Sequence, residues 1–165
     1  IKVWVSEWGK FDLRKIVEGG NKSMEEFNKY ARKAVRIITK SHDLKSTPEN
    51  PVTQAAFIVD FDGMKLDQYA HLPTVMYALD LAKEHRDIIQ KHASRIVIVN
   101  TNFIAEAAIN LGRNVFGRLF ERVEVFGANK SRWVHHLRRI FPADQIPEWY
   151  GGTKKSHKPL FIYGK

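Results

Sequence analysis

The spacing of apolar residues alternates between two periods along the chain. Continuous apolar runs of strand length occur at residues 55–59 and 96–99, and segments 2–5 and 123–126 also have the pattern of short strands. Between and after these runs, apolar residues recur at the spacing of amphipathic helices in segments 23–38, 73–89, 103–117 and 130–140. Such alternation is typical of parallel strands that are joined by right-handed helical crossovers. The pattern therefore predicts one α/β domain with a mostly parallel sheet and flanking helices.

Local signals indicate where several of these helices begin. Ser23 followed by Glu26 has the spacing of a capping box and predicts a helix start. Pro73 suits the first turn of the next long helix, because its missing N–H is not needed there. Asn129 predicts an ordinary N-cap for the helix that follows it.

Composition predicts a soluble, basic domain without thiol chemistry. The chain has 165 residues, of which 44% are hydrophobic, no cysteine, and a net charge of +9. No apolar run approaches the roughly 20 residues of a membrane-spanning helix. The lack of cysteine excludes disulfides and thiolate metal sites and fits a reducing cytosol. The positive charge favours anionic partners such as nucleic acid, acidic lipid or phosphate-bearing ligands.

Asp60 and Asp62 form the sharpest enzymatic signal in the sequence. They occupy alternate positions at the end of a buried strand, where two carboxylates can hold Mg²⁺. The motif resembles the first motif of haloacid-dehalogenase-type phosphatases, and Thr101 falls where their second motif has a hydroxyl. The sequence departs from that pattern at Met64, and segment 125–129 lacks the later acidic pair. A Mg²⁺-dependent phosphatase is therefore the alternative, and a turn at Asp62 with Asp60 bound to loop amides is favoured.

Other candidate constellations do not predict a metal site or nucleic-acid binding. The adjacent His135 and His136 point apart on a helix, so they cannot chelate one metal ion. Segment 127–131 lacks the glycine-rich length of a phosphate-binding loop. Trp133 and Leu137 share one side of the basic helix, so Trp133 is expected to anchor that helix rather than to stack on bases. We therefore expect no metal, no nucleic-acid partner and no catalysis.

The helix predicted at residues 103–117 is unusually apolar around its circumference. Its polar residues Glu106, Asn110 and Arg113 form one narrow stripe, which is expected to face water. The remaining apolar surface is wider than the stripe of about 100° that a sheet-covering helix needs. Periodicity alone leaves two explanations open, a helix buried between the sheet and a neighbouring helix, or a lid over an apolar cavity.

Several motifs in a fixed order resemble the CRAL-TRIO domain of lipid-transfer proteins, the family of the yeast phosphatidylinositol-transfer proteins. The motifs are FIVDFDG, SRIVIVNTNFIAEAAINLGRNVF, ERVEVFGANK and LRRIFPADQIPEWYGG. The resemblance covers residues 1–152. The segment 153–165 looks like a linker or the start of a following domain, as in animal members such as supernatant protein factor, where a GOLD domain follows. The family also carries a helical segment before its lipid-binding domain.

The resemblance implies an apolar cavity that is floored by the sheet and closed by a mobile gate helix at 103–117. One hydrophobic lipid would be held there and exchanged at a membrane when the helix swings. The residues expected in the cavity or gate are Phe61, Tyr69, Met76, Leu79, Val99, Thr101, Phe103, Ala107, Ala108, Leu111, Val115, Phe116, Phe120 and Val123. The residues expected to meet headgroups or the membrane are Arg113, Arg118 and Arg122. No cofactor besides the lipid is expected.

The resemblance leaves the identity of the lipid open. At the positions of the family's phosphatidylinositol-binding residues stand Ser94, Leu119 and Arg122, of which only the basic residue matches. Phosphoinositide specificity is therefore not implied, and a tocopherol, squalene, a retinoid or another phospholipid stays open. The expected protein is a monomeric cytoplasmic carrier that contacts anionic membranes transiently. A lipid-sensing regulatory module without bulk transfer is the other reading.

Overall fold

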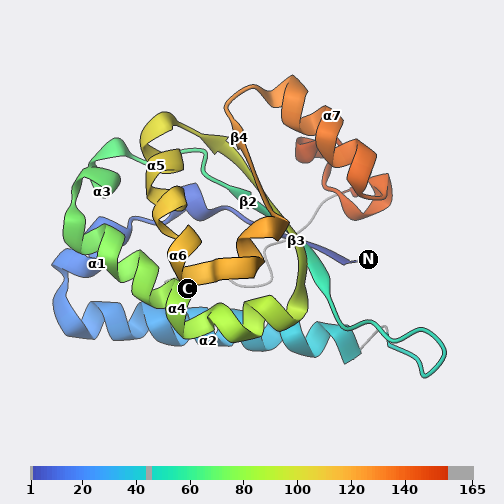
Figure 1. The fold of residues 1–165 in the computed structure, drawn as a ribbon, viewed down its shortest axis with the longest axis horizontal. Coiled ribbons are helices and arrows are strands. Elements are labelled where there is room, and N and C mark those ends of the chain that lie inside the picture. Colours follow the sequence, from blue (N-terminus) through green and yellow to red (C-terminus); the bar gives the residue numbers. More distant parts are fainter. Residues whose placement is uncertain (1, 44–45, 156–165) are drawn as a thin grey trace.

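A sheet of parallel strands forms the centre of the computed structural model, which describes residues 2–43 and 46–155 (Figure 1). Its strands are β1 (Lys2–Ser6), β2 (Ala55–Asp60), β3 (Ala93–Thr101) and β4 (Val123–Gly127). They lie in the order β1-β2-β3-β4, and every neighbouring pair is parallel. The predicted α/β fold with a parallel sheet is therefore confirmed.

Helices connect the strands and flank the sheet. In chain order they are α1 (Leu13–Glu18), α2 (Gly20–Asp43), α3 (Leu66–Ala70), α4 (Leu72–His92), α5 (Phe103–Leu111), α6 (Arg113–Phe116) and α7 (Lys130–Ile140). Short 3-10 turns occupy residues 8–10, 117–122, 143–145 and 148–150. In Figure 1, α7 lies on one side of the strands, and α3 to α6 lie on the other.

The helix starts follow two of the three predicted signals. Asn129 caps α7 with its side chain, and Pro73 lies in the first turn of α4, so both predictions are confirmed. The predicted capping box is wrong, because α2 begins before Ser23. The side-chain cap in this region belongs to Asp12, which accepts a backbone N–H in the first turn of α1. Segment 9–12 therefore leads directly into a short helix.

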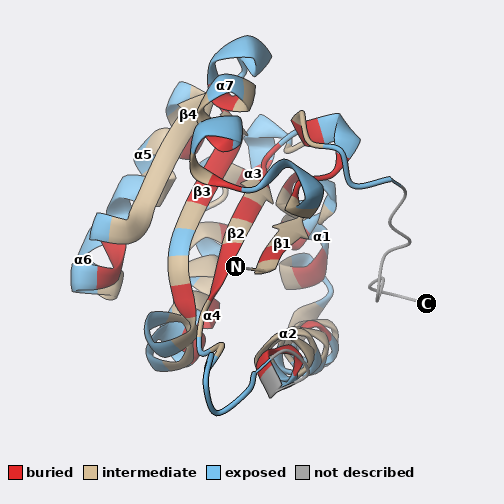
Figure 2. Ribbon diagram, turned by 90° about the vertical axis from the view of Figure 1, so that its right-hand side faces the viewer, coloured by how far each residue is buried: buried red, intermediate tan, exposed pale blue. Residues whose placement is uncertain are grey.

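The two faces of the sheet carry different clusters, because side chains alternate along each strand. Val97 and Val99 of β3 face α7, where they pack in one cluster with the buried Trp133 and Leu137. Trp133 therefore anchors α7 to the sheet, as predicted. The other face of β3 carries Ile98 in a separate cluster. Figure 2 shows the buried positions concentrated along β2 and β3, the central strands.

A third cluster holds α1, α2 and α4 together beside the sheet. Its buried members are Leu13 and Ile16 of α1, Phe27 of α2 and Leu81 of α4. The rings of Phe27 and Phe11 meet edge to face with centroids 5.4 Å apart, a favourable aromatic geometry. This cluster fixes α4, which forms part of the cavity described below.

The segment predicted as one helix at 103–117 is interrupted at Gly112. A Cβ atom at Gly112 would lie 3.2 Å from the ring of Phe116, so the glycine lets this ring pack against the helix. Gly117 has a φ of 51°, which favours glycine and starts the 3-10 turn before β4. The prediction of one continuous helix is therefore wrong, and α5 and α6 are two short helices in series.

The chain after the regular part returns to the body of the domain. Thr153 donates its backbone N–H to the carbonyl of Ala143 at 2.8 Å. The expected linker or start of a following domain at 153–165 lies mostly outside the described residues. In the part of the chain that the structure describes, no helix is both long and apolar enough to cross a membrane.

Candidate ligand-binding cavity

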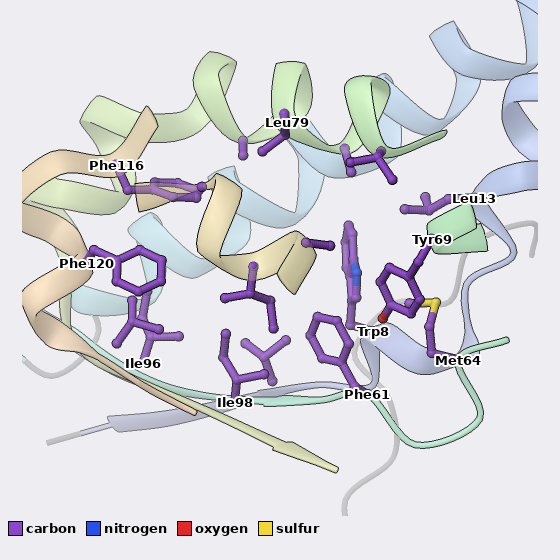
Figure 3. Close-up of a pocket in the computed structure, with 18 of the residues that line it drawn as sticks. Trp8, Leu13, Phe61, Met64, Tyr69, Leu79, Ile96, Ile98, Phe116 and Phe120 are labelled. Carbon is purple, nitrogen blue, oxygen red and sulfur yellow. The ribbon is translucent and has the colours of Figure 1, made fainter. Parts of the chain in front are cut away.

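An apolar cavity lies between the sheet and α3 to α6 (Figure 3). Its volume is about 250 Å³, which is just below the roughly 300–1,000 Å³ typical of small-molecule pockets. The floor comes from the second face of the sheet, including Val59, Ile96 and Ile98. None of the described residues that line the cavity is an Asp, Glu, Lys, Arg or His. The walls therefore suit an uncharged apolar molecule.

The structure brings half of the residues expected in the cavity or gate to its wall. These residues are Phe61, Tyr69, Leu79, Ala108, Phe116, Phe120 and Val123. They come from the residue after β2, from α3, α4, α5, α6, the turn 117–122 and β4, so distant parts of the chain converge on one space. Phe61 and Tyr69 stack with ring centroids 6.5 Å apart and form part of one end of the cavity.

The alternation of side chains explains why Val99 and Thr101 lie elsewhere. Val99 is fully buried in the cluster on the α7 face, on the opposite side of the sheet from Ile98. Thr101 is buried, and its hydroxyl lies 3.0 Å from both the Glu106 carboxylate and the Phe126 carbonyl. The residues of β3 that face the cavity are instead Ile96 and Ile98, which the sequence analysis missed although their even spacing is a usable signal.

The side chains of α5 that face the cavity also differ from those expected. Ala108 and Ile109 turn inward to the cavity, and Ala105 is buried beneath the helix. Phe103 is 79% exposed and Leu111 is 56% exposed, so neither lies on the cavity wall.

The other residues expected in the cavity or gate also lie off the wall. Ala107 is exposed, Val115 is half-buried, and Met76 of α4 is 47% exposed. Asn110 and Arg113 face solvent as expected, whereas Glu106 is half-buried beside Thr101.

Polar side chains gather at one end of the cavity. Trp8, Gln68 and Tyr69 line the wall there, and Figure 3 shows Trp8 and Tyr69 together with Leu13 at the end opposite Phe116. The carboxamide oxygen of Gln68 accepts the backbone N–H of Leu13 at 2.8 Å. The Tyr69 hydroxyl is buried without a hydrogen-bond partner among the described residues. Trp8 was not among the residues expected in the cavity.

Burial also affects the ionisation of Tyr69 at this end of the cavity. It raises the pKa of the Tyr69 hydroxyl above its ordinary value, because the charged phenolate would lose its hydration. The hydroxyl therefore stays protonated at neutral pH and can donate one hydrogen bond and accept another.

The three arginines expected to meet the membrane have different roles in the structure. Arg118 is exposed. Arg113 is also exposed, but its guanidinium lies 4.3 Å from the ring centroid of Phe120, where it covers a cavity residue from outside. Arg122 donates to the carbonyls of Gln90 and Ala93 at 3.0 and 2.8 Å, so it ties the end of α4 to β4.

Asp60 is committed to structural hydrogen bonds. One of its carboxylate oxygens accepts the backbone N–H of Asp62 at 2.9 Å and the amide of Asn100 at 2.8 Å. The other oxygen accepts the hydroxyl of Tyr150 at 2.7 Å. Among the described residues, no group of three His, Cys, Asp or Glu side chains is placed to hold a metal ion. The arrangement gives no support to the phosphatase alternative.

A parallel sheet, a helical cover and an uncharged cavity between them define an α/β domain that binds apolar ligands. The sequence matches the CRAL/TRIO domain over residues 3–152, and the chain belongs to this family. CRAL/TRIO domains bind small lipophilic ligands and generally serve ligand binding or transfer rather than catalysis. A comparison with curated proteins finds no match.

Proposed function

We propose that this domain holds one hydrophobic lipid in the cavity and exchanges it at membrane surfaces. The observation that carries the proposal is the cavity itself, whose walls are apolar and uncharged. Burying a chain of about 16 carbons is worth roughly 13 kcal/mol at about 0.8 kcal/mol per methylene group. Affinity for a lipid therefore needs little polar chemistry from the protein.

The α5–α6 segment is the part of the cavity wall best suited to act as a gate. It is broken at Gly112 and ends at Gly117, so two glycines flank the short helix α6. Its inner side contributes Ala108, Ile109 and Phe116 to the cavity. Outward movement of this segment would open the cavity along its length.

An outer apolar surface supports contact with a membrane. Five large apolar side chains are exposed on α3, α4 and α5, and these helices contact one another. They are Leu66, Leu72, Met76, Phe103 and Leu111. The exposed Arg113 and Arg118 follow α5 directly and would meet anionic headgroups at up to about 1 kcal/mol each. The gate would thus face the bilayer from which the lipid must be removed.

Adjacent alanines of α5 give a matched test of the cavity. Ala108 lines the cavity, whereas its neighbour Ala107 is exposed and does not line it. In Ala108→Trp, the larger side chain fills the space that the lipid needs. We expect at least a tenfold loss of affinity for N-phenylnaphthylamine, a neutral dye that fluoresces in apolar surroundings, and little loss in Ala107→Trp.

The same two variants distinguish a lipid carrier from a lipid-sensing module. Lipid transfer between vesicles should fall with dye binding in Ala108→Trp if the protein carries lipid. Wild-type protein that binds the dye but moves no lipid between vesicles would indicate a lipid-sensing module. Equal dye affinity in both variants and the wild type would contradict the assignment of this cavity as the lipid site.

A further inference from the structure

Two histidines that are far apart in the sequence meet close to the start of β2. His42 lies in the last turn of α2 and is 4% exposed, whereas His92 is half-buried and is the last residue of α4 (Figure 1). Their Nδ1 atoms lie 3.3 Å apart. The Nδ1 atom of His92 also lies 3.2 Å from the carbonyl oxygen of Thr53, an exposed residue. Two imidazole nitrogens and one carbonyl oxygen are thus gathered at an edge of the domain that solvent reaches.

Direct hydrogen bonds use these three atoms incompletely. A neutral histidine carries one ring hydrogen, so Nδ1 of His92 has at most one hydrogen for two partners. Its distances to these partners, 3.3 and 3.2 Å, are at or beyond the long end of the range of about 2.7–3.2 Å for such bonds. A metal ion would instead use the lone pairs of both nitrogens at once.

We propose that His42 and His92 bind a divalent transition-metal ion, and that Zn²⁺ fits the pair best. A tetrahedral Zn²⁺ ion holds imidazole nitrogens at roughly 2.0–2.1 Å, which places two such nitrogens about 3.3 Å from each other. The two Nδ1 atoms already have this separation. Imidazole suits zinc, copper and nickel, whereas magnesium and calcium prefer oxygen ligands.

The remaining ligand positions would be filled by the Thr53 carbonyl oxygen and by water. No third His, Cys, Asp or Glu side chain completes the set in the part of the chain that the structure describes. The ion would link the last turns of α2 and α4 to the segment that enters β2. None of the three ligand residues lines the apolar cavity, so the metal site is independent of the lipid site.

Calorimetric titration of the untagged chain with Zn²⁺ tests this inference, with Mg²⁺ as the comparison. The variants are His42→Gln and His92→Gln, each of which removes one imidazole and keeps a polar side chain. His135→Gln is the matched control, because His135 is exposed on α7 and reports adventitious binding of zinc to a surface histidine.

We expect the wild-type chain to bind Zn²⁺ with a stoichiometry of one and not to bind Mg²⁺. The affinity for Zn²⁺ should fall at least tenfold in His42→Gln and in His92→Gln and should be unchanged in His135→Gln. X-ray absorption at the zinc edge should show imidazole nitrogens at roughly 2.0–2.1 Å from the bound ion.

Several results would overturn the inference. They are a lack of Zn²⁺ binding to the wild type, equal affinity for Zn²⁺ and Mg²⁺, and an equal loss in His135→Gln. Unchanged zinc affinity in either folded variant would overturn it as well. Because His42 is buried, circular dichroism checks the fold of its variant, and if His42→Gln does not fold, the half-buried His92 decides the outcome through His92→Gln.

Discussion

The Tyr69 hydroxyl is a buried polar group that the protein does not satisfy by itself. Such a group costs folding free energy, because water hydrates it in the unfolded chain and nothing replaces that water in the folded domain. A polar group of this kind persists where function requires it. The unpaired hydroxyl therefore lowers the stability of the ligand-free domain.

Tyr69→Phe should stabilise the ligand-free domain by about 1 kcal/mol at neutral pH, since it removes the unpaired hydroxyl and keeps the ring. The measurement is the free energy of unfolding in denaturant, with delipidated protein. Tyr77→Phe should have the opposite sign, because its hydroxyl bonds to Asn28 and to the Met24 carbonyl. Destabilisation by Tyr69→Phe in the ligand-free protein would contradict the account of this hydroxyl.

The effect of Tyr69→Phe on the free energy of unfolding also depends on pH. Burial raises the pKa of Tyr69, so the unfolded chain loses this proton first, near the ordinary tyrosine pKa of about 10. The free energy of unfolding is therefore insensitive to this group below that pH, where Tyr69 is neutral in both states, and falls as the pH rises above it. Tyr69→Phe should therefore lose less stability than the wild type above about pH 10. An unchanged slope would show that Tyr69 ionises equally in both states.

At the scale of single residues, the apolar character of the cavity could be predicted from the sequence, but the position of each lining residue could not. Phe61, Leu79 and Phe120 lie on the cavity wall. Val99 lies on the opposite face of the sheet, because strand 96–99 is apolar on both faces and only the register decides which face meets the cavity. Trp8 was missed because no local pattern in the sequence marks it as a cavity residue.

The α5–α6 segment shows what periodicity can and cannot predict about an element. Its apolar character was visible in the sequence, which left open a buried helix and a lid over an apolar cavity. The inner side of α5 is buried against the cavity, whereas Phe103 and Leu111 remain exposed on the outer side. The break at Gly112 was not predictable from spacing, because it depends on the close approach of Phe116.

The order of strands and helices was the most predictable level of the whole molecule. The spacing of apolar residues changes repeatedly from that of a strand to that of a helix along the chain. Because the crossovers between parallel strands are right-handed, few arrangements of the strands are then possible. The helix faces that meet solvent were less predictable, because an exposed apolar residue and a buried one look alike in a sequence. The outer apolar surface therefore emerged only from the structure.

The outer apolar surface leads to a prediction about membrane binding. Phe103→Glu should weaken binding to phosphatidylcholine–phosphatidylserine vesicles about tenfold, because the ring, 79% exposed, would no longer be buried in the bilayer. Co-sedimentation with vesicles measures this effect. Trp149→Glu is the control, since Trp149 is also exposed, at 63%, but lies outside this surface. Equal losses in both variants would contradict a specific membrane-contact surface.

The central claim is that one hydrophobic lipid occupies the cavity. Its most direct test is native mass spectrometry of the protein after incubation with vesicles made from a total tissue lipid extract. The account predicts a single added mass per chain, identified as a lipid after extraction, and its absence in Ala108→Trp. Bare protein in the wild type, or an equal added mass in Ala108→Trp, would contradict the claim.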